Sequence, residues 1–366
     1  FEHPNNFPRV EYDADGNRLG LLVEEQRTNL ITYSEDFSDS SWNSNKQGIS
    51  VAVNVAVAPD GTLTADKLNE TATTNRHRIG FDISSVGDAV FSFFAKAGER
   101  TFVRTWAFVG GNTDGAEFNL SNGTIVREHT SGAATIKNVG NGWYRCSCIV
   151  DAASANSVVV GPVTEAVSGN DNYAGEAGKG IYIWGAQLEE ASFPTSYIKN
   201  EGTPSGATRS ADVASIPVAD FGYNQSAGTV FVEAKGIGDG VNFPRFVNFQ
   251  DDSSNRWELI GDTGLDVRMF QRFSATSDVN SDIILNVLDG QTNIKLAYAK
   301  AENDAAGSGN GSAVVTDTSN GQLSSVDTLY IGVGSDGGTD FLTGHIKSIK
   351  YYPRRLTNAQ LQDLTS

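Results

Sequence analysis

"GHIKSIKYYPRRLTNAQLQDL", residues 344–364, is the stretch that shows most clearly how this chain folds. Its first nine residues mix isoleucine and tyrosine with lysine and serine, which is typical of a β-strand. The segment TNAQLQDLT that follows predicts a short helix with Thr357 as its N-cap. A strand followed by a brief helix is therefore expected near the C-terminus.

Similar strand-like runs fill the rest of the chain. Examples are AVFSFFAKA (89–97), WYRCSCIV (143–150), GIYIWGAQLE (180–189), GTVFVEAKGI (228–237) and NRWELIG (255–261). The runs recur about every ten residues and are separated by Gly, Asn and Asp turns, a rhythm typical of β-sandwiches and jelly rolls. The sequence therefore predicts an all-β protein with two antiparallel, lectin-like jelly-roll sandwiches in tandem and a short C-terminal helix.

Domain boundaries follow from changes in composition. Residues 1–30 read as an irregular lead-in with a hairpin through the turn DADGN, and residues 31–200 as a first sandwich similar to a carbohydrate-binding module. The polar, Gly/Pro/Ser-rich stretch within 201–226 predicts a linker, and residues 227–366 predict a second jelly roll.

Charge and hydropathy exclude several classes of function. The 366 residues carry a formal net charge of -17, and this argues against nucleic-acid binding, which requires clustered Lys and Arg. No apolar run approaches the roughly 20 residues that span a bilayer, so we expect no membrane insertion. The chain starts at Phe1 rather than Met, which favours a longer precursor.

The two cysteines, Cys146 and Cys148, lie two residues apart in a predicted strand. On a strand this spacing points both thiols to one face, about 6.5–7 Å apart at Cα, at the edge of disulfide geometry. We therefore expect buried free thiols.

The second half resembles the concanavalin A-like and laminin-G-like jelly-roll superfamily. The likeness covers about residues 227–366 and is carried by the first strand GTVFVEA and by a closing motif of Gly344, Ile346, Ile349, Tyr351, Tyr352, Arg355, Leu356, Leu361 and Leu364. It implies a lectin-like sandwich. It also implies a candidate Ca²⁺ site in the rim loops, for which Asp251, Asp252, Asp336 and Asp340 are the candidate ligands; ordinary Asx turns are the alternative.

The first half resembles tail fibres, tail spikes and other virion surface proteins of tailed bacteriophages. The opening motif comprises Tyr12, Asp13, Gly16, Leu21, Leu22, Val23, Glu24, Arg27, Thr28, Asn29, Leu30, Ser34, Glu35, Phe37 and Trp42. The closing motif runs from Trp184 to Ile198 and continues at Thr208, Arg209, Ala211 and Asp212. No heptad stem or trimeric β-helix accompanies these motifs, so any fibre shaft would lie upstream or be absent.

Two carboxylate doublets invite an enzymatic interpretation. Glu189 and Glu190 follow Trp184, and the other doublet is Glu24 with Glu25. Neighbouring strand residues point to opposite faces, whereas glycosidase carboxyls lie about 5–9.5 Å apart on one cleft wall. We therefore predict no enzymatic activity. Instead, Glu24 is expected to pair with Arg27 or Arg209, and Trp184 to enter the core on the face of Tyr182, Ala186 and Leu188.

Two polar residues are expected to stabilise a corner of the first sandwich. The elements RTNL and QLE would meet where its first and last strands come together, and Asn29 and Gln187 would hydrogen-bond neighbouring backbone there.

Candidate saccharide contacts are aromatic side chains in polar surroundings. Trp42, Tyr223 and Trp257 fit this description, although Trp42 occupies a position that usually packs inward. His77, which lies between two arginines, is a further candidate and could contact an anionic sugar. The alternative is that His77 lies on a solvated strand face with no ligand. Trp106, Trp143 and Trp184 are expected in the core.

The function that fits these observations is a non-enzymatic phage virion surface protein, a tail fibre or decoration, that attaches to host cell-surface polysaccharide. Its partners would be that polysaccharide, other virion proteins and, by resemblance, two further copies in a homotrimer; it would lie on the virion surface in the extracellular space. One alternative is a carbohydrate-binding module of a secreted polysaccharide-degrading enzyme. Another is a ligand-free structural decoration of the capsid or tail.

Overall fold

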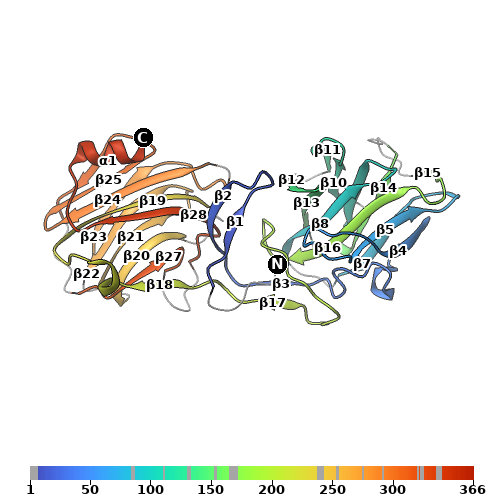
Figure 1. Cartoon of the computed structure of the whole chain (residues 1–366), viewed down its shortest axis with the longest axis horizontal. Helices are drawn as coiled ribbons and strands as arrows, with labels where there is room; N and C mark the ends of the chain where they lie inside the picture. The colour runs from blue at the N-terminus through green and yellow to red at the C-terminus, as the bar shows by residue number, and fades with distance from the viewer. Residues whose placement is uncertain are drawn as a thin grey trace. The chain divides into compact units, whose positions relative to one another are not determined.

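The computed structural model describes residues 7–83, 87–109, 112–129, 133–151, 155–164, 172–236, 243–252, 255–273, 276–290, 292–319, 321, 325–334 and 340–366. The chain divides into two compact units. The first unit contains residues 27–209, and the second contains residues 2–26 together with 210–366. Each unit is built from antiparallel sheets (Figure 1).

Two main sheets form the first unit. The six-stranded sheet has the order β12 (Ala134–Gly140), β13 (Trp143–Asp151), β8 (Asp88–Ala97), β16 (Gly180–Glu189), β5 (Ala65–Glu70) and β4 (Ile49–Ala56). The five-stranded sheet has the order β11 (Thr124–His129), β10 (Asn112–Asn119), β9 (Phe102–Val109), β14 (Ala155–Val163) and β7 (Ile79–Asp82). Short pairs join β15 (Tyr173–Ala174) to β6 (Thr74–Asn75) and β17 (Ala207–Arg209) to β3 (Arg27–Asn29), and a 3₁₀ turn, η1, spans Ser40–Trp42.

The core of the first unit lies between these two sheets. Strand β8 contributes Phe91 and Phe93, whose rings pack 5.6 Å apart, and β10 contributes Phe118 at 6.5 Å from Phe93. Residues at every second position of a strand share a face, so these aromatic rings meet in one layer. A smaller apolar cluster forms on the other face of the six-stranded sheet around Phe94, Trp143 and Trp184.

The prediction for the face of Trp184 was half right. Trp184 is buried and shares the smaller cluster with Tyr182, whereas Ala186 and Leu188 lie in the main core. The reason is a bulge at Gly185, which has φ of 61° and coincides with a shift in the pairing register of β16. An extra residue in a strand reverses the faces of the residues that follow it.

The second unit also contains two sheets. The seven-stranded sheet has the order β1 (Val10–Tyr12), β2 (Arg18–Val23), β28 (Gly344–Tyr352), β19 (Ala227–Gly236), β24 (Ile294–Ala301), β25 (Asp304–Gly309) and β26 (Val315–Asp317). The six-stranded sheet has the order β18 (Ala214–Pro217), β27 (Thr328–Ile331), β20 (Arg245–Asp252), β21 (Asn255–Gly261), β22 (Val267–Phe273) and β23 (Thr276–Ile284). A 3₁₀ turn, η2, spans Val218–Phe221, and the helix α1 spans Asn358–Thr365.

The N-terminal hairpin forms as predicted, since β1 pairs with β2 across the DADGN turn. It does not stand apart as a lead-in, because β2 also pairs with β28 through Leu21↔Ile346 and Val23↔Gly344. The expected linker likewise contains strands, β17 in the first unit and β18 in the second. The second sandwich therefore contains residues from both sides of the first.

The fold class and the C-terminal helix agree with the sequence prediction. Thr357 caps α1 in a capping box, in which its side chain accepts from the Gln360 amide and the Gln360 side chain accepts from the Thr357 amide. Cys146 and Cys148 are buried free thiols in β13, and burial raises the pKa of Cys146. Among the described residues, the model contains no helix with the length and apolar character to cross a bilayer.

Candidate ligand-binding site

Asn29 organises the corner from which the candidate site is built. Its side chain is fully buried and uses four hydrogen bonds. Its amide nitrogen donates to the carbonyls of Ala186 (3.1 Å) and Ile198 (2.8 Å), and its oxygen accepts from the amides of Ile31 (3.0 Å) and Leu188 (3.1 Å). The predicted role of Asn29 is confirmed. One side chain thereby fixes three chain segments to one another.

Gln187 performs the corresponding task on β16. Its oxygen accepts from the Ile198 amide at 2.6 Å, and its nitrogen donates to Glu189 at 2.7 Å. Glu189 is itself buried and accepts from the Thr195 amide at 3.1 Å. These bonds hold the segment 195–200 against β16. The predicted role of Gln187 is confirmed, and Glu189 is a structural acceptor.

The segment 33–37 is held beside residues 197–200 by hydroxyl groups. Ser34 accepts from the Asn200 amide (2.9 Å) and lies 2.7 Å from the Tyr197 hydroxyl. The Tyr197 hydroxyl in turn donates to Glu35 at 3.0 Å. Burial, followed by the nearby charge of Glu35, raises the pKa of Tyr197, so this hydroxyl stays a donor at any ordinary pH. Glu35 is thereby fixed in position.

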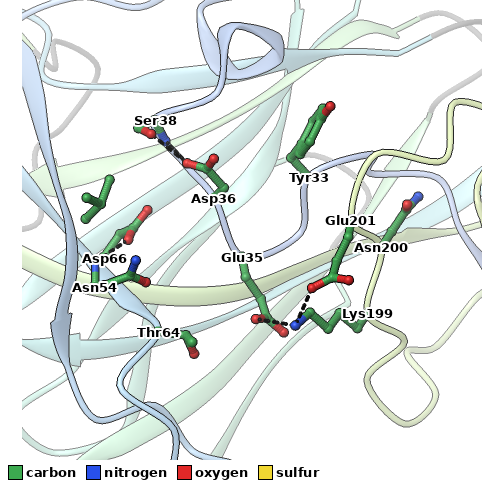
Figure 2. Close-up of a pocket in the computed structure, with 11 residues that line it drawn as sticks. Tyr33, Glu35, Asp36, Ser38, Asn54, Thr64, Asp66, Lys199, Asn200 and Glu201 are labelled. Atoms are coloured by element: carbon green, nitrogen blue, oxygen red, sulfur yellow. Dashed lines mark hydrogen bonds and ion pairs between the residues drawn. The ribbon is translucent and has the colours of Figure 1, made fainter.

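A hollow of about 400 Å³ opens where these segments meet β4 and β5 (Figure 2). We call it the polar hollow. It is lined by Tyr33, Glu35, Asp36, Ser38, Val53, Asn54, Thr64, Asp66, Lys199, Asn200 and Glu201. Most of these side chains carry hydrogen-bonding groups, and four of them are carboxylates. The lining comes entirely from the first unit.

Lys199 neutralises one side of the polar hollow. Figure 2 shows its ammonium between two carboxylates, with Nζ 2.6 Å from Glu201 and 3.3 Å from Glu35. The hydrogen bond to Glu201 is the main reason that the pKa of Lys199 is raised. The side chain of Glu35 is only 13% exposed, whereas that of Glu201 is 75% exposed. Glu35 therefore belongs to the wall and Glu201 to the rim.

Asp66 lies at the floor of the polar hollow. It is 1% exposed, and its two oxygens accept from the backbone amides of Phe37 (3.0 Å) and Asn54 (2.9 Å). Asn54 has φ of 54° and interrupts the pairing of β4 with β5. Burial raises the pKa of Asp66 to about 6. Asp66 therefore both shapes the bulge of β4 and changes charge near pH 6.

Aromatic packing supports the wall from behind. Trp184 packs 4.5 Å from the ring of Tyr197, and its indole nitrogen donates to Thr64 at 3.0 Å. Thr64 lines the polar hollow. Trp184 precedes the bulge at Gly185 and lies on the face of Tyr182, from which it supports Thr64.

The sequence-predicted contacts Trp42 and His77 lie in the first unit but away from solvent. Trp42 is fully buried, packs 4.8 Å from Phe37, and donates to the Tyr33 carbonyl at 2.8 Å. His77 is 3% exposed, with Nδ1 2.7 Å from the Gly48 carbonyl oxygen. Neither ring presents a face on which a sugar could stack.

Tyr223 and Trp257 lie together in the second unit. Trp257 is fully buried and donates to the Tyr223 hydroxyl at 2.9 Å. The half-buried Tyr223 ring stacks between Phe249 (5.7 Å) and Tyr351 (5.4 Å). Both side chains thus belong to one aromatic cluster of the core.

The two candidate calcium ligands whose side chains are described, Asp251 and Asp340, have separate partners. Asp251 accepts from the Ser325 hydroxyl at 2.6 Å, and Asp340 pairs with Arg245. Asp336 lies outside the described residues, as does the side chain of Asp252. Within the described part of the chain, no three His, Cys, Asp or Glu residues are placed to hold a metal ion.

The remaining carboxylates of the two doublets are structural or exposed. Glu24 pairs with Arg9 at 2.8 Å, and Arg9 also contacts Asp212; Arg9 is a partner that the sequence analysis did not consider. Glu190 is exposed and accepts from the Gly87 amide at 3.4 Å. Glu189 is buried and Glu190 is exposed, so these two carboxylates do not face one bond.

Of the residues that line the polar hollow, sequence reasoning singled out Glu35 alone and missed the others, among them Asn54, Asp66, Lys199 and Glu201. It singled out Ser34, Glu35 and Phe37 through the bacteriophage motif, and all three lie at the polar hollow or directly behind it. A usable signal was the uncharged run 47–59, followed after the turn by Asp66 in a strand. A buried acid in a strand needs hydrogen-bond donors.

No protein-family model and no curated protein matches the chain. Three solved structures illustrate what its fold resembles. The Ruminococcus gnavus IT-sialidase CBM40 bound to alpha2,6 sialyllactose aligns over 39% of this chain and 85% of its own, at 14% identity and TM-score 0.33. The heptameric SAP-like pentraxin of Limulus polyphemus aligns over 40% and 74%, at 18% identity and TM-score 0.33. The toad ovary galectin in complex with thio-digalactose aligns over 38% and 98%, at 12% identity and TM-score 0.27.

Proposed function

We propose that this chain is a non-enzymatic saccharide-binding protein and that the polar hollow of the first unit is its binding site. The observation that carries the proposal is the hollow itself. Its volume of about 400 Å³ lies in the range of about 300–1,000 Å³ that is usual for small-ligand sites. A hydroxyl-rich ring fits a lining of this kind because each hydroxyl donates and accepts at once.

The lining offers both partners that a hydroxyl needs. Carboxylates accept, and the ammonium of Lys199 donates. Val53 and the half-buried ring of Tyr33 supply apolar surface for the C–H groups of a sugar ring. Because carboxylates outnumber the one lysine, the ligand we expect is neutral or carries an amino group.

The absence of catalysis is part of the proposal. A general acid or base must be free to reach the reacting atom. Both oxygens of Asp66 are held by backbone amides, and Glu35 is held by Tyr197 and Lys199. These contacts suit carboxylates that shape a site.

We further propose that this binding serves attachment of a tailed-phage particle to host cell-surface polysaccharide. Support comes from the sequence motif itself, since Glu35 of the bacteriophage-like segment lines the polar hollow and Tyr197 of the closing motif fixes it. Many copies on one particle would raise avidity by about 10²–10⁴-fold over a single weak site.

The test is a glycan array with the full chain, followed by calorimetry on the bound glycan. Asp36→Asn and Glu201→Gln alter exposed carboxylates of the hollow, and each should weaken binding about tenfold. Glu190→Gln changes an exposed carboxylate outside the hollow and should bind like the parent. Equal affinity in all three variants would show that the ligand binds outside the polar hollow. If no glycan on the array were bound, the alternative of a ligand-free structural decoration would be favoured. If incubation with any polysaccharide released reducing ends, the proposal that the protein is not an enzyme would be refuted.

A further inference from the structure

We infer a second saccharide-contact surface, on the outer face of the six-stranded sheet of the second unit, centred on Asn248 and Gln250 of β20. It goes beyond the polar hollow, shares no residue with it, and belongs to the other unit. The ligand that it suits is a neutral sugar ring.

Alternation along β20 turns these two amides away from the core. Val247 and Phe249 are fully buried and belong to the core of the second unit. Asn248 lies between these two residues in the strand, and Gln250 follows Phe249. Both amide side chains therefore point to the opposite face of the sheet. A sheet face that presents amide side chains instead of apolar ones is suited to hydrogen bonding.

The orientation of the Asn248 amide is determined by its partners. Its nitrogen donates to the carbonyl of Gly334 and, at 2.7 Å, to the side-chain oxygen of Gln250. Because the Gly334 carbonyl can only accept, the nitrogen must lie on this side. The side-chain oxygen of Asn248 therefore points elsewhere, and no described residue donates to it, although Asn248 is only 1% exposed.

Gln250 supplies the complementary group. Its oxygen is engaged by Asn248, so its nitrogen faces away, and no described residue accepts from that nitrogen. The two side chains thus keep one spare acceptor and one spare donor on neighbouring positions of one face. A single hydroxyl can donate to the first and accept from the second. A buried acceptor without a donor is unfavourable, so a ligand that satisfies it gains binding energy.

The neighbouring strands complete the surface. Tyr330 of β27 lies directly opposite Asn248, and Thr328 lies opposite Gln250. On the other side, Glu258 and Arg256 of β21 occupy the matching positions. Directly opposed residues of antiparallel strands share a face with Cβ atoms about 4.5–5.5 Å apart. The half-buried Tyr330 ring therefore lies beside the two amides, where it can pack against the C–H face of a sugar.

The charged groups next to the two amides pair with one another, which points to a neutral ligand. Glu258 is fully buried and accepts from Nε of Arg256 (2.9 Å) and Nε of Arg245 (3.1 Å). Arg245 pairs in turn with Asp340. Two guanidinium groups and two carboxylates neutralise each other, so neither an acidic nor a basic sugar is favoured.

The experiment follows the side-chain amide signals of Asn248 and Gln250 by NMR while the full chain is titrated with methyl glycosides of glucose, galactose and mannose. We expect saturable shifts of both amides with at least one glycoside. Gln250→Glu keeps the oxygen that Asn248 needs and removes the spare donor, so it should weaken binding about tenfold. Tyr330→Ser should weaken it similarly, whereas the matched control Tyr330→Phe keeps the ring and should bind nearly as well as the parent. Melting curves of the two Tyr330 variants should match the parent, which separates lost binding from lost folding; Gln250→Glu adds a carboxylate at a position only 7% exposed, so its binding is compared at a temperature below its own melting transition.

Glycerol serves as a hydroxyl-bearing control without a ring. Shifts with glycerol equal to those with the glycosides would mean that the orphan acceptor merely holds water, and would overturn the inference. Shifts in the polar hollow with none at Asn248 and Gln250 would overturn it too, but would leave the proposed function intact. Shifts at these amides with none in the hollow would support it while refuting the hollow as the site.

Discussion

At the corner of the first unit, Asn29 is the side chain whose removal should reduce stability most. It makes four hydrogen bonds while fully buried, so Asn29→Ala leaves two backbone carbonyls and two backbone amides without partners. We expect a loss of about 2–4 kcal/mol in the unfolding free energy of the first unit. Urea denaturation followed by fluorescence of the buried tryptophans measures it.

Thr28→Ala is the matched control, because Thr28 precedes Asn29 and its hydroxyl bond to Thr208 is exposed. This variant should lie within about 0.5 kcal/mol of the parent. If Asn29→Ala proved as mild as the control, the corner would not depend on this amide.

Asp66 should titrate near pH 6, far above an ordinary aspartate, because burial raises its pKa. A carboxyl whose pKa is raised in the folded state takes up its proton there first. Its contribution to stability is therefore fully present below about pH 4 and is lost as the pH rises through 6. Carbon NMR of the aspartate carboxyls should show one midpoint near 6, and Asp66→Asn should remove it.

The same proton is expected to alter the polar hollow. Below pH 6 the floor loses one negative charge, so a ligand with an amino group should bind more weakly there than at pH 7. If every aspartate signal titrated at ordinary values, below about pH 5, then the floor would be more open to water than its 1% exposure implies.

At the scale of elements, the bulge in β16 is the feature to test. Gly185 has φ of 61°, and a Cβ placed there would lie 2.9 Å from the Phe94 ring and 3.3 Å from the Tyr197 ring. Gly185→Ala should therefore cost about 1–3 kcal/mol through backbone conformation and crowding. Thermal melting measures the loss.

Gly178→Ala provides the comparison, since Gly178 also has positive φ (83°) but no atom lies within 4 Å of the added Cβ. It isolates the backbone cost, which should be about 1 kcal/mol. Equal losses in the two variants would mean that the aromatic wall tolerates the extra carbon.

The bulge also shows where sequence reasoning succeeds and where it stops. Local patterns and motifs correctly predicted the strands, the hairpin of β1 and β2, and the capped helix α1. They also predicted the buried hydrogen-bonding roles of Asn29 and Gln187. The faces of Ala186 and Leu188 do not follow, because the bulge at Gly185 reverses the side chains that come after it. Register and bulges depend on partners that are distant in sequence.

Site prediction was limited by the same physics. Aromatic residues in polar sequence surroundings, such as Trp42 and Trp257, proved to be buried, because their strand neighbours do not reveal what packs over them. The polar hollow is assembled from segments around 33–38, 53–66 and 199–201. Only the tertiary fold brings these segments together.

At the scale of the whole molecule, the second unit needs the N-terminal hairpin. Strand β2 pairs with β28, its Leu21 packs against the core of the second unit, and its Val23, which is 1% exposed, lies against Gly332. Removal of residues 1–26 should lower the unfolding free energy of the second unit by about 3–6 kcal/mol, the contribution of two large apolar side chains. Hydrogen exchange of the β28 amides should rise, while amides of the first unit should keep their protection.

Tyr12→Ala changes an exposed side chain of the same hairpin and should leave β28 protected. Unchanged exchange in β28 after the truncation would show that the five strands from β28 to β26 suffice without the hairpin.

The pairing of β2 with β28 also sets an order of events during synthesis. The first unit is complete once residue 209 has been made, and it can fold while the ribosome is still at work. The hairpin, although made earlier, must wait for a strand that begins at residue 344, a delay on the order of tens of seconds at about 5–20 residues per second. During that interval the unpaired edge of β2 can pair with a wrong strand, so nascent chains should be most prone to aggregation until residues 344–352 have been made.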